Sequence, residues 1–275
     1  MEKSFEIRFP FESDYENLKK LWRTAFDDTA ESLDFFFENT VSPDRVLVAF
    51  DSDKPVSALY MLESDILIDD KEYSAYYIYA VCTHPDFRGK GLMRSLFEKL
   101  FEVSKSRNID YLFLVPEGEY LFKLYEKLGF KNGFSYSQKI LLKRDYKDVL
   151  NIENQKLTYE TYRKCIEENK KDVPIAALKE TAFNSFFNSV SGEVKAFFVE
   201  NEGYALCEDT EENITVYELS GNEELLLNVI FQNTEKESLI YRQIADLNPI
   251  SYGMFYKIKD VPEIVNGFFG IPYSN

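Results

Sequence analysis

The sequence predicts an α/β (α+β) fold, with a mixed and mostly antiparallel central sheet flanked by helices, and a second, smaller region of similar layout. Three observations predict it. Segments rich in β-branched and aromatic residues alternate with turn residues between 45 and 83, as in an antiparallel meander. Two spaced glycines then open a strongly amphipathic helix, and the short apolar run 111–115 follows as a buried strand. The helix and the strands on either side of it form a βαβ crossover.

The periodicity of the first half predicts each element in order. Apolar residues alternate over 5–9 as in a strand, and Ser13 or Asp14 stands where a helix N-cap would, ahead of apolar residues at helical spacing up to Phe26. Phenylalanines mark a second helix from Ala30 to about Thr40. The remaining expected elements are strands at 45–50, 56–64, 66–68 and 73–83, a helix over 92–103, a strand at 111–115, a helix over 120–128 stopped by Gly129, and a strand over 130–142.

The second half repeats this order in outline. Residues 151–156 are polar and predict a linker. The expected elements are helices over 159–168, 179–189 and 222–232 and strands at 195–200, 204–207, 214–219, 239–243 and 251–257. The helix at 222 begins with Glu223 and Glu224, which would repel phosphate. We therefore expect no phosphate-binding corner in this half.

A glycine corner in the first half is, by contrast, suited to bind phosphate. It reads Pro85, Asp86, Phe87, Arg88, Gly89, Lys90, Gly91, Leu92, Met93. Glycines at 89 and 91 give the backbone conformations closed to other residues and let a ligand approach the amides. The first turn of the following helix leaves N–H groups without partners, and its dipole adds partial positive charge. Because Arg88 and Lys90 add full charges, the corner predicts a pyrophosphate site.

Composition limits the class of protein. The chain has 275 residues and a net charge of −16, with 27 acidic and 21 basic residues up to position 150, so nucleic acid is not expected as a partner. Neither a signal peptide nor a membrane-spanning segment is recognisable, which predicts a cytoplasmic protein with no membrane partner. Cys82, Cys165 and Cys207 are widely spaced, and they predict buried thiols rather than disulfides or a metal site.

Two markers resemble the GCN5-related N-acetyltransferase (GNAT) superfamily. The first is the segment from Val81 to Gly91, which is similar to the acetyl-CoA signature, and the second is Leu124-Tyr125-Glu126-Lys127-Leu128-Gly129-Phe130. The acidic second half resembles the degenerate second domain of the "enhanced intracellular survival" type acetyltransferases, without their third domain. The resemblance thus implies a catalytic, acetyl-CoA-binding domain over 1–148 and a degenerate GNAT-like domain over 149–275.

The resemblance also implies roles for individual residues. The strand edge at Val81, Cys82 and Thr83 would bind the pantetheine arm, and the amide near Val81 would polarise the acetyl carbonyl. Tyr125 would protonate the departing thiolate. The pyrophosphate would lie on the amides of Arg88, Gly89, Lys90, Gly91, Leu92, Met93 and Arg94. The cofactor expected is acetyl-CoA as co-substrate, with no metal.

The sequence departs from the family pattern in three places. Asp86 replaces the usual Gln or Arg, so its side chain must point away from the anion; the asparagine often found ahead of the second marker is missing; and the strand 73–83 contains no carboxylate to act as base. Glu117 and Glu119 could act as a base through water, although an acid there is more often a cap. His84, before Pro85, favours a structural turn. Tyr76, Tyr77 and Tyr79 lie on both faces of the predicted strand 73–83. One face of that strand should line the acceptor site, and the other should join the core.

The leading hypothesis is an acetyl-CoA-dependent N-acetyltransferase in which a primary amine of a small molecule or peptide attacks the thioester directly. Acidic surroundings favour polyamine, aminoglycoside or peptide amines. The alternatives are an acyl-CoA-binding regulatory module without catalysis, and an aminoacyl transferase of the tandem-domain kind used in cell-wall synthesis, against which the intact CoA corner argues. The sequence leaves the oligomeric state open, a homo-oligomer included.

Overall fold

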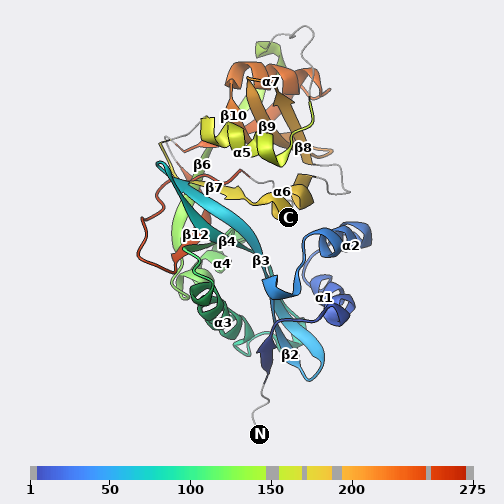
Figure 1. Ribbon diagram of the computed structural model, residues 1–275. Coiled ribbons are helices and arrows are strands. Elements are labelled where there is room, and N and C mark those ends of the chain that lie inside the picture. The colour runs from blue at the N-terminus through green and yellow to red at the C-terminus, as the bar shows by residue number, and fades with distance from the viewer. Residues whose placement is uncertain (1–4, 147–154, 169–171, 188–193, 246–248, 271–275) are drawn as a thin grey trace. The chain divides into compact units, whose positions relative to one another are not determined.

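The computed structural model describes residues 5–146, 155–168, 172–187, 194–245 and 249–270, and Figure 1 shows its helices and strands. The chain forms two compact units that are not divided by a single cut in the sequence. The first unit comprises Met1–Ile66, Glu72–Asn132 and Gly253–Glu263, and the second comprises Leu67–Lys71, Gly133–Tyr252 and Ile264–Asn275. The predicted boundary between 148 and 149 lies outside the described residues.

The first unit contains a mixed sheet with strand order β1-β2-β3-β4-β5-β12. Strands β4 and β5 are parallel, whereas β1 with β2, β2 with β3, and β5 with β12 are antiparallel. The sheet is therefore mostly antiparallel, as predicted. The strands are β1 (Glu6–Arg8), β2 (Val46–Asp51), β3 (Lys54–Ile68), β4 (Lys71–Thr83), β5 (Tyr111–Leu114) and β12 (Ile250–Lys257).

Helices cover both faces of this sheet (Figure 1). Alternate residues of β2 pack into two different cores: Leu47 and Ala49 join the cluster under α3 and α4, whereas Val48 and Phe50 join the cluster under α1 and α2. This alternation is the two-residue period of a strand buried on both faces. The helices are α1 (Tyr15–Trp22), α2 (Ala30–Asn39), α3 (Leu92–Ser106) and α4 (Gly118–Glu126).

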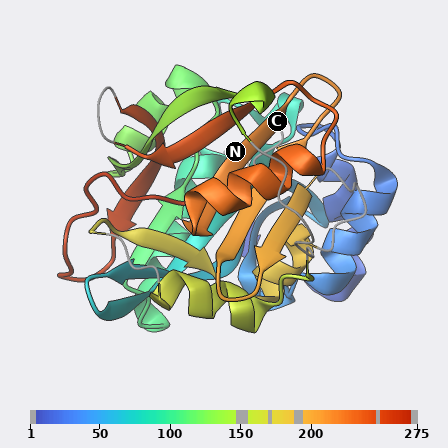
Figure 2. The same cartoon turned by 90° about the horizontal axis from the view of Figure 1, so that it is seen from above.

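The second unit has the strand order β6-β11-β10-β9-β8. Its strands β10 and β11 are parallel and are connected by α7, which Figure 2 shows lying across the strands. The unit thus repeats the strand, helix, strand crossover of the first. Its elements are β6 (Lys131–Leu142), α5 (Tyr159–Glu168), β7 (Ile175–Leu178), α6 (Glu180–Phe187), β8 (Val194–Val199), β9 (Gly203–Asp209), β10 (Ile214–Gly221), α7 (Glu223–Gln232) and β11 (Ser238–Ile244).

Most predicted elements are present within a few residues of their expected bounds. Two differ in kind. Strand β3 runs unbroken through Asp65, which is buried and separates the two strands expected at 56–64 and 66–68. Strand β7 was not predicted, because four residues after Pro174 are too short to show periodicity. Cys82, Cys165 and Cys207 are buried free thiols, as expected. No helix in the described ranges is long and apolar enough to cross a membrane.

The first unit is completed by a strand from near the end of the chain. In β12, Met254 pairs with Leu114 of β5 and is fully buried in the same core as α3 and α4. Tyr256 stacks on Phe101 of α3 with ring centroids 4.4 Å apart. Conversely, most of β6, which follows α4 in sequence, pairs with β11 in the second unit. Each unit therefore contains a strand from the other half of the sequence.

This exchange predicts that a charge placed in β12 unfolds the first unit. Met254→Asp should lower the free energy of unfolding by roughly 3–5 kcal/mol, because it buries an unpaired carboxylate. Ser251→Asp, at an exposed position of the same strand, should change it by less than about 0.5 kcal/mol. Hydrogen exchange of the α3 amides would report the effect in the first unit. Unchanged α3 protection in Met254→Asp would contradict the role given to β12.

The second unit buries a carboxyl group in its core. Glu218 of β10 is 5 % exposed and accepts a hydrogen bond from the Tyr204 hydroxyl. Burial raises the pKa of Glu218 from 4.5 to about 7, although hydrogen bonds from Tyr204 and the Gly270 backbone oppose the shift. The folded state therefore binds this proton more tightly than the unfolded chain does.

A raised carboxyl pKa makes the second unit less stable as the pH rises. The contribution of Glu218 is complete below about pH 4.5 and is lost by about pH 7, a change on the order of 3 kcal/mol. Glu218→Gln keeps the shape of the side chain and removes its charge. The free energy of unfolding of this variant, relative to that of the parent, should therefore increase by about 3 kcal/mol between about pH 4.5 and pH 7. Urea unfolding at several pH values measures the difference, and the exposed Glu212→Gln is the control. A parallel pH dependence in Glu218→Gln and the parent would contradict the burial argument.

Candidate active site

The glycine corner adopts the conformation that its sequence predicts. Gly89 and Gly91 have φ of +75° and +78°, in the left-handed region that only glycine enters readily. An added Cβ would meet no heavy atom within 4 Å at either position, so the space beside the backbone is open. Gly91 is the N-cap of α3, and no side chain caps this helix. Among the described residues, the first amides of α3 thus have no side-chain cap, which leaves them available to an anion.

The side chains of Arg88 and Lys90 are held near this corner by nearby backbone carbonyl groups. Arg88 Nε donates to the Thr83 carbonyl at 3.2 Å, and Lys90 Nζ donates to the Asp86 carbonyl at 2.9 Å. Lys90 Nζ also lies 4.4 Å from the centroid of the Phe87 ring. Both side chains are exposed, so their positive charges stay near the corner while remaining accessible. These contacts add charge next to the free amides of α3.

His84 and Asp86 shape the turn before the corner. The His84 backbone N–H donates to the Val56 carbonyl at 2.9 Å, and its Nδ1 accepts from the Asp86 N–H at 3.3 Å. Both contacts of His84 stabilise the turn, which is the structural role expected from its place before Pro85. The Asp86 side chain is 83 % exposed, and its carboxylate lies 3.9 Å from His84 Nδ1. Asp86 binds Lys90 through its backbone carbonyl and not through its carboxylate.

Strand β4 separates from β5 as it approaches the corner. The parallel pairing includes Tyr76 with Leu112 and ends at Tyr77 with Phe113, but β4 continues to Thr83. The final residues of β4 are held from β3: the Ser57 hydroxyl donates to the Cys82 carbonyl at 2.8 Å and lies 2.7 Å from Thr83 Oγ1. The edge of β4 that would face β5 is therefore open beside the predicted pantetheine-binding residues.

An alanine in a strained conformation marks the point of separation. Ala80 has φ +47°, which costs a residue with a Cβ of the order of 1–3 kcal/mol. The left-handed φ rotates the adjoining peptide planes, including that of Val81, away from the regular strand geometry. Sequence reasoning missed Ala80, since alanine is not a turn residue. The strain lies next to the amide that was predicted to polarise the acetyl carbonyl.

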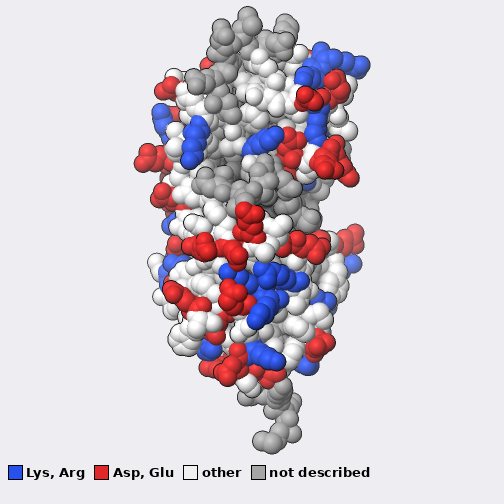
Figure 3. Space-filling model, turned by 90° about the vertical axis from the view of Figure 1, so that its right-hand side faces the viewer, with Lys and Arg blue, Asp and Glu red and all other residues white. Residues whose placement is uncertain are grey.

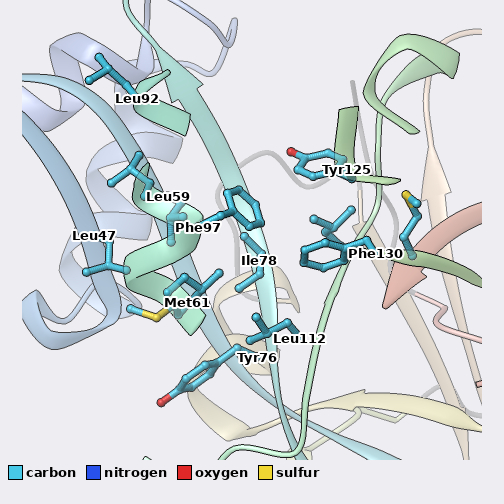
Figure 4. Packing of buried hydrophobic residues seen from close by; sticks show 14 of the residues in the cluster. Leu47, Leu59, Met61, Tyr76, Ile78, Leu92, Phe97, Leu112, Tyr125 and Phe130 are labelled. Carbon is cyan, nitrogen blue, oxygen red and sulfur yellow. The ribbon is translucent and has the colours of Figure 1, made fainter. Parts of the chain in front are cut away.

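Tyr125 lies in the same core as Val81 and the start of α3. Its ring is 6 % exposed and packs 5.6 Å from Phe97 and 5.9 Å from Phe130, as Figure 4 shows. Val81 and Leu92 belong to this cluster. Among the described residues the Tyr125 hydroxyl has no hydrogen-bonding partner, and burial raises the pKa of the phenol above its usual value. The buried phenol is therefore protonated at neutral pH, and a thiolate placed beside it would be the natural acceptor for its hydrogen bond.

Other predicted candidates have less specific positions. Glu117 is the N-cap residue of α4 but its side chain caps no amide, and the Glu119 side chain is 95 % exposed. Tyr76 lies in the α3 core, and Tyr77 stacks on Phe113 with centroids 5.2 Å apart. Tyr79 instead packs in the cluster under α1 and α2. Among the described residues, no hydrogen bond or ion pair joins either glutamate to the glycine corner.

A carboxylate that the sequence did not single out lies between α1 and α2. Asp28 accepts a hydrogen bond from Trp22 Nε1 at 2.7 Å. Burial raises the pKa of Tyr79, and the charge of Asp28 contributes to the shift. Trp22, Phe36 and Tyr79 lie within 5.8 Å of one another by ring centroids. The connection between the first two helices therefore presents a carboxylate beside aromatic rings, and this proximity cannot be read from the sequence because it depends on how the helices pack.

The surface charge in Figure 3 is mixed. On the face shown, acidic and basic side chains of the described residues are intermingled. Binding along a nucleic-acid backbone uses a broad run of positive charge. The cations at the glycine corner are instead a local feature suited to a small anion.

Comparison with known proteins identifies the first half. Residues 6–133 match the family profile described as Acetyltransferase (GNAT) domain. This range contains the glycine corner, the open strand edge and Tyr125. No curated protein sequence matches the chain closely.

Solved structures resemble the chain over nearly its whole length. A GCN5-related N-acetyltransferase from Kribbella flavida has a TM-score of 0.72 at 14 % identity, covering 92 % of this chain and 70 % of that one. Eis1 from Mycobacterium abscessus has a TM-score of 0.68 at 13 % identity, covering 93 % and 74 %. A putative acetyltransferase from Pyrococcus horikoshii has a TM-score of 0.62 at 20 % identity, covering 98 % and 95 %. These likenesses show that the chain shares the fold of these structures over most of its length, beyond the matched residues.

Proposed function

We propose that this chain, whose residues 6–133 form a GNAT acetyltransferase domain, transfers the acetyl group of acetyl-CoA to a primary amine by direct attack. The observation that carries the proposal is the convergence of three features in one unit. These are the glycine corner at Gly89 and Gly91, the edge of β4 beyond its pairing with β5, and the Tyr125 hydroxyl, which has no partner among the described residues. Acetyl-CoA could use all three, through its pyrophosphate, its pantetheine arm and its sulfur.

The residues at the corner fit acetyl-CoA. Open space beside both glycines lets a phosphate reach the backbone, and the amides from Arg88 to Arg94 would hold it with the charges of Arg88 and Lys90. The edge at Val81, Cys82 and Thr83 would pair with the amides of the pantetheine arm as an added strand does. Burial raises the pKa of the Cys82 thiol to about 12, so this thiol stays protonated and does not compete as a nucleophile.

Acetyl-CoA would supply an activated acyl group with a thiol as its leaving group. The Val81 amide would donate to the carbonyl oxygen as that oxygen gains charge. Tyr125, whose phenol is protonated at neutral pH, would donate its proton to the departing sulfur as the C–S bond breaks, and the proton lost from the amine nitrogen would return to the phenolate or pass to solvent. The acceptor amine would approach from α1 and α2, where Asp28 and the surrounding rings suit a cationic group such as a polyamine, an aminoglycoside or a peptide amine.

A second candidate function is an acyl-CoA-binding module without catalysis. The absence of a carboxylate from the described residues of β4 favours it, since no base for the amine is built into that strand. Incubation with acetyl-CoA and a panel of polyamines, aminoglycosides and peptides, followed by mass spectrometry, separates the two. Acetylated amine formed in proportion to enzyme supports catalysis. Acetyl-CoA binding without any acetylated product supports the binding module.

A further inference from the structure

The second unit contains a cavity at the place where its own parallel strands separate. The pairing of β10 with β11 ends at Val216 with Tyr241, although both strands continue. A register shift between Val216 and Glu218 marks a bulge in β10 at this level. The cavity has a volume of about 210 Å³, and its walls include Glu218, Ser220 and Arg242 together with apolar residues of α5 and β7.

This cavity does not suit a CoA-like ligand. Asn222 caps α7 by accepting from the Leu225 N–H at 3.3 Å, and Glu223 and Glu224 follow in the first turn. A side-chain cap and two acids therefore occupy the position where the first unit has free amides and two cations. The cavity volume of about 210 Å³ lies below the roughly 300–1,000 Å³ of pockets for drug-sized ligands, so it suits a small metabolite rather than a nucleotide.

Arg242 is a cation that pairs with no carboxylate of the described residues. Its guanidinium carbon lies 4.6 Å from the Tyr136 ring centroid and 4.4 Å from that of Tyr217. Within the described ranges no carboxylate forms an ion pair with it, and its buried Nε has no hydrogen-bonding partner. The two rings hold the guanidinium between them, and a buried donor without a hydrogen bond destabilises the folded state. A bound carboxylate would satisfy this donor in the geometry that arginine prefers.

Glu218 is the complementary group in the same cavity. It lines the wall and is 5 % exposed, and its described hydrogen-bond donors are the neutral Tyr204 hydroxyl and the Gly270 amide. Among the described residues no cation forms an ion pair with it. Burial without a counter-charge raises its pKa to about 7. A ligand ammonium would supply the missing charge and favour the ionised carboxylate.

We propose that this cavity binds a small zwitterion of the amino-acid class, with its carboxylate on Arg242 and its ammonium toward Glu218. Two charged groups of opposite sign line one cavity without pairing with each other or with other described residues. A ligand with both charges satisfies both, whereas a singly charged ligand leaves one unpaired. The site is separate from the glycine corner, and the proposal does not depend on the acetyltransferase activity.

Titration calorimetry on the full chain tests this proposal. The probes are glycine, β-alanine and L-glutamate, with acetate and succinate as carboxylates and methylamine and putrescine as amines. At least one zwitterion should bind with a dissociation constant of about 1 mM or lower, and singly charged analogues should bind about tenfold more weakly. No zwitterion binding at about 10 mM would overturn the proposal. Carboxylates that bind as tightly as zwitterions would overturn the role of Glu218.

Three variants locate the bound ligand. Arg242→Met and Glu218→Gln should each weaken zwitterion binding by about tenfold or more. Arg144→Met, which changes an exposed arginine of the second unit, should not. Ile175→Phe narrows the cavity without changing a charge and should also weaken binding. Near-ultraviolet circular dichroism and an unchanged acetyl-CoA affinity would show that each variant is folded. Binding unaffected by Arg242→Met in a folded protein would place the ligand elsewhere and overturn the proposal.

Discussion

Gly89→Glu is expected to weaken acetyl-CoA binding by about 100-fold or more, which corresponds to roughly 3 kcal/mol. The backbone at Gly89 has φ +75°, and the space beside it is open, so the new carboxylate would occupy the position proposed for pyrophosphate. A carboxylate and a phosphate in contact repel each other strongly in a partly desolvated site. Titration calorimetry with acetyl-CoA measures the loss.

Gly118→Glu is the matched control for this prediction. Gly118 has φ +76°, has no heavy atom within 4 Å of an added Cβ, and begins α4. The substitution therefore introduces the same charge and a similar backbone strain at a position outside residues 88–94, and acetyl-CoA affinity should change by less than about threefold. S-acetyl-pantetheine, which lacks the pyrophosphate, should bind the parent and Gly89→Glu equally. Equal losses of acetyl-CoA affinity in the two glycine variants would exclude the corner as the specific pyrophosphate site.

Tyr125→Phe is expected to lower kcat by about 100- to 1000-fold while KM for acetyl-CoA changes by less than about threefold. The hydroxyl has no partner among the described residues, so its removal breaks no hydrogen bond of the folded chain. The ring contacts with Phe97 and Phe130 remain. Thiol release in the presence of an active amine measures the rates.

Tyr120→Phe provides the corresponding control on the same helix. Tyr120 is 75 % exposed, and loss of its hydroxyl should leave kcat within about twofold. A fall in acetyl-CoA affinity that matches the fall in kcat would identify Tyr125 as a packing residue instead. A normal kcat in Tyr125→Phe would remove it from the reaction altogether.

The corner was predictable from sequence because its chemistry is local. Two glycines between a strand and an amphipathic helix specify positive φ, and the structure shows it at Gly89 and Gly91. The position of Tyr125 on a helix that ends before Gly129 follows from spacing in the same way, and Gly129 has φ +93°. The GNAT match over 6–133 confirms the family resemblance that these markers carried. The roles of the individual residues remain predictions.

Features that depend on distant pairing were not predictable. The residues 253–263 complete the first unit, yet nothing in their two-residue period shows that Met254 pairs with β5 rather than with a nearer strand. Ala80 adopts a strained φ because the surrounding sheet imposes it. The separate charges of Glu218 and Arg242 become informative only when folding places both in one cavity. Local propensity contains none of this information.

A crystal structure of the complex with CoA tests the central claim most directly. The proposal predicts pyrophosphate oxygens about 3 Å from backbone amides between Arg88 and Arg94, and the sulfur within hydrogen-bonding reach of the Tyr125 hydroxyl. The pantetheine arm should pair with the edge of β4 at Val81–Thr83. A pyrophosphate bound away from Gly89 and Gly91, or a sulfur out of reach of Tyr125, would contradict it.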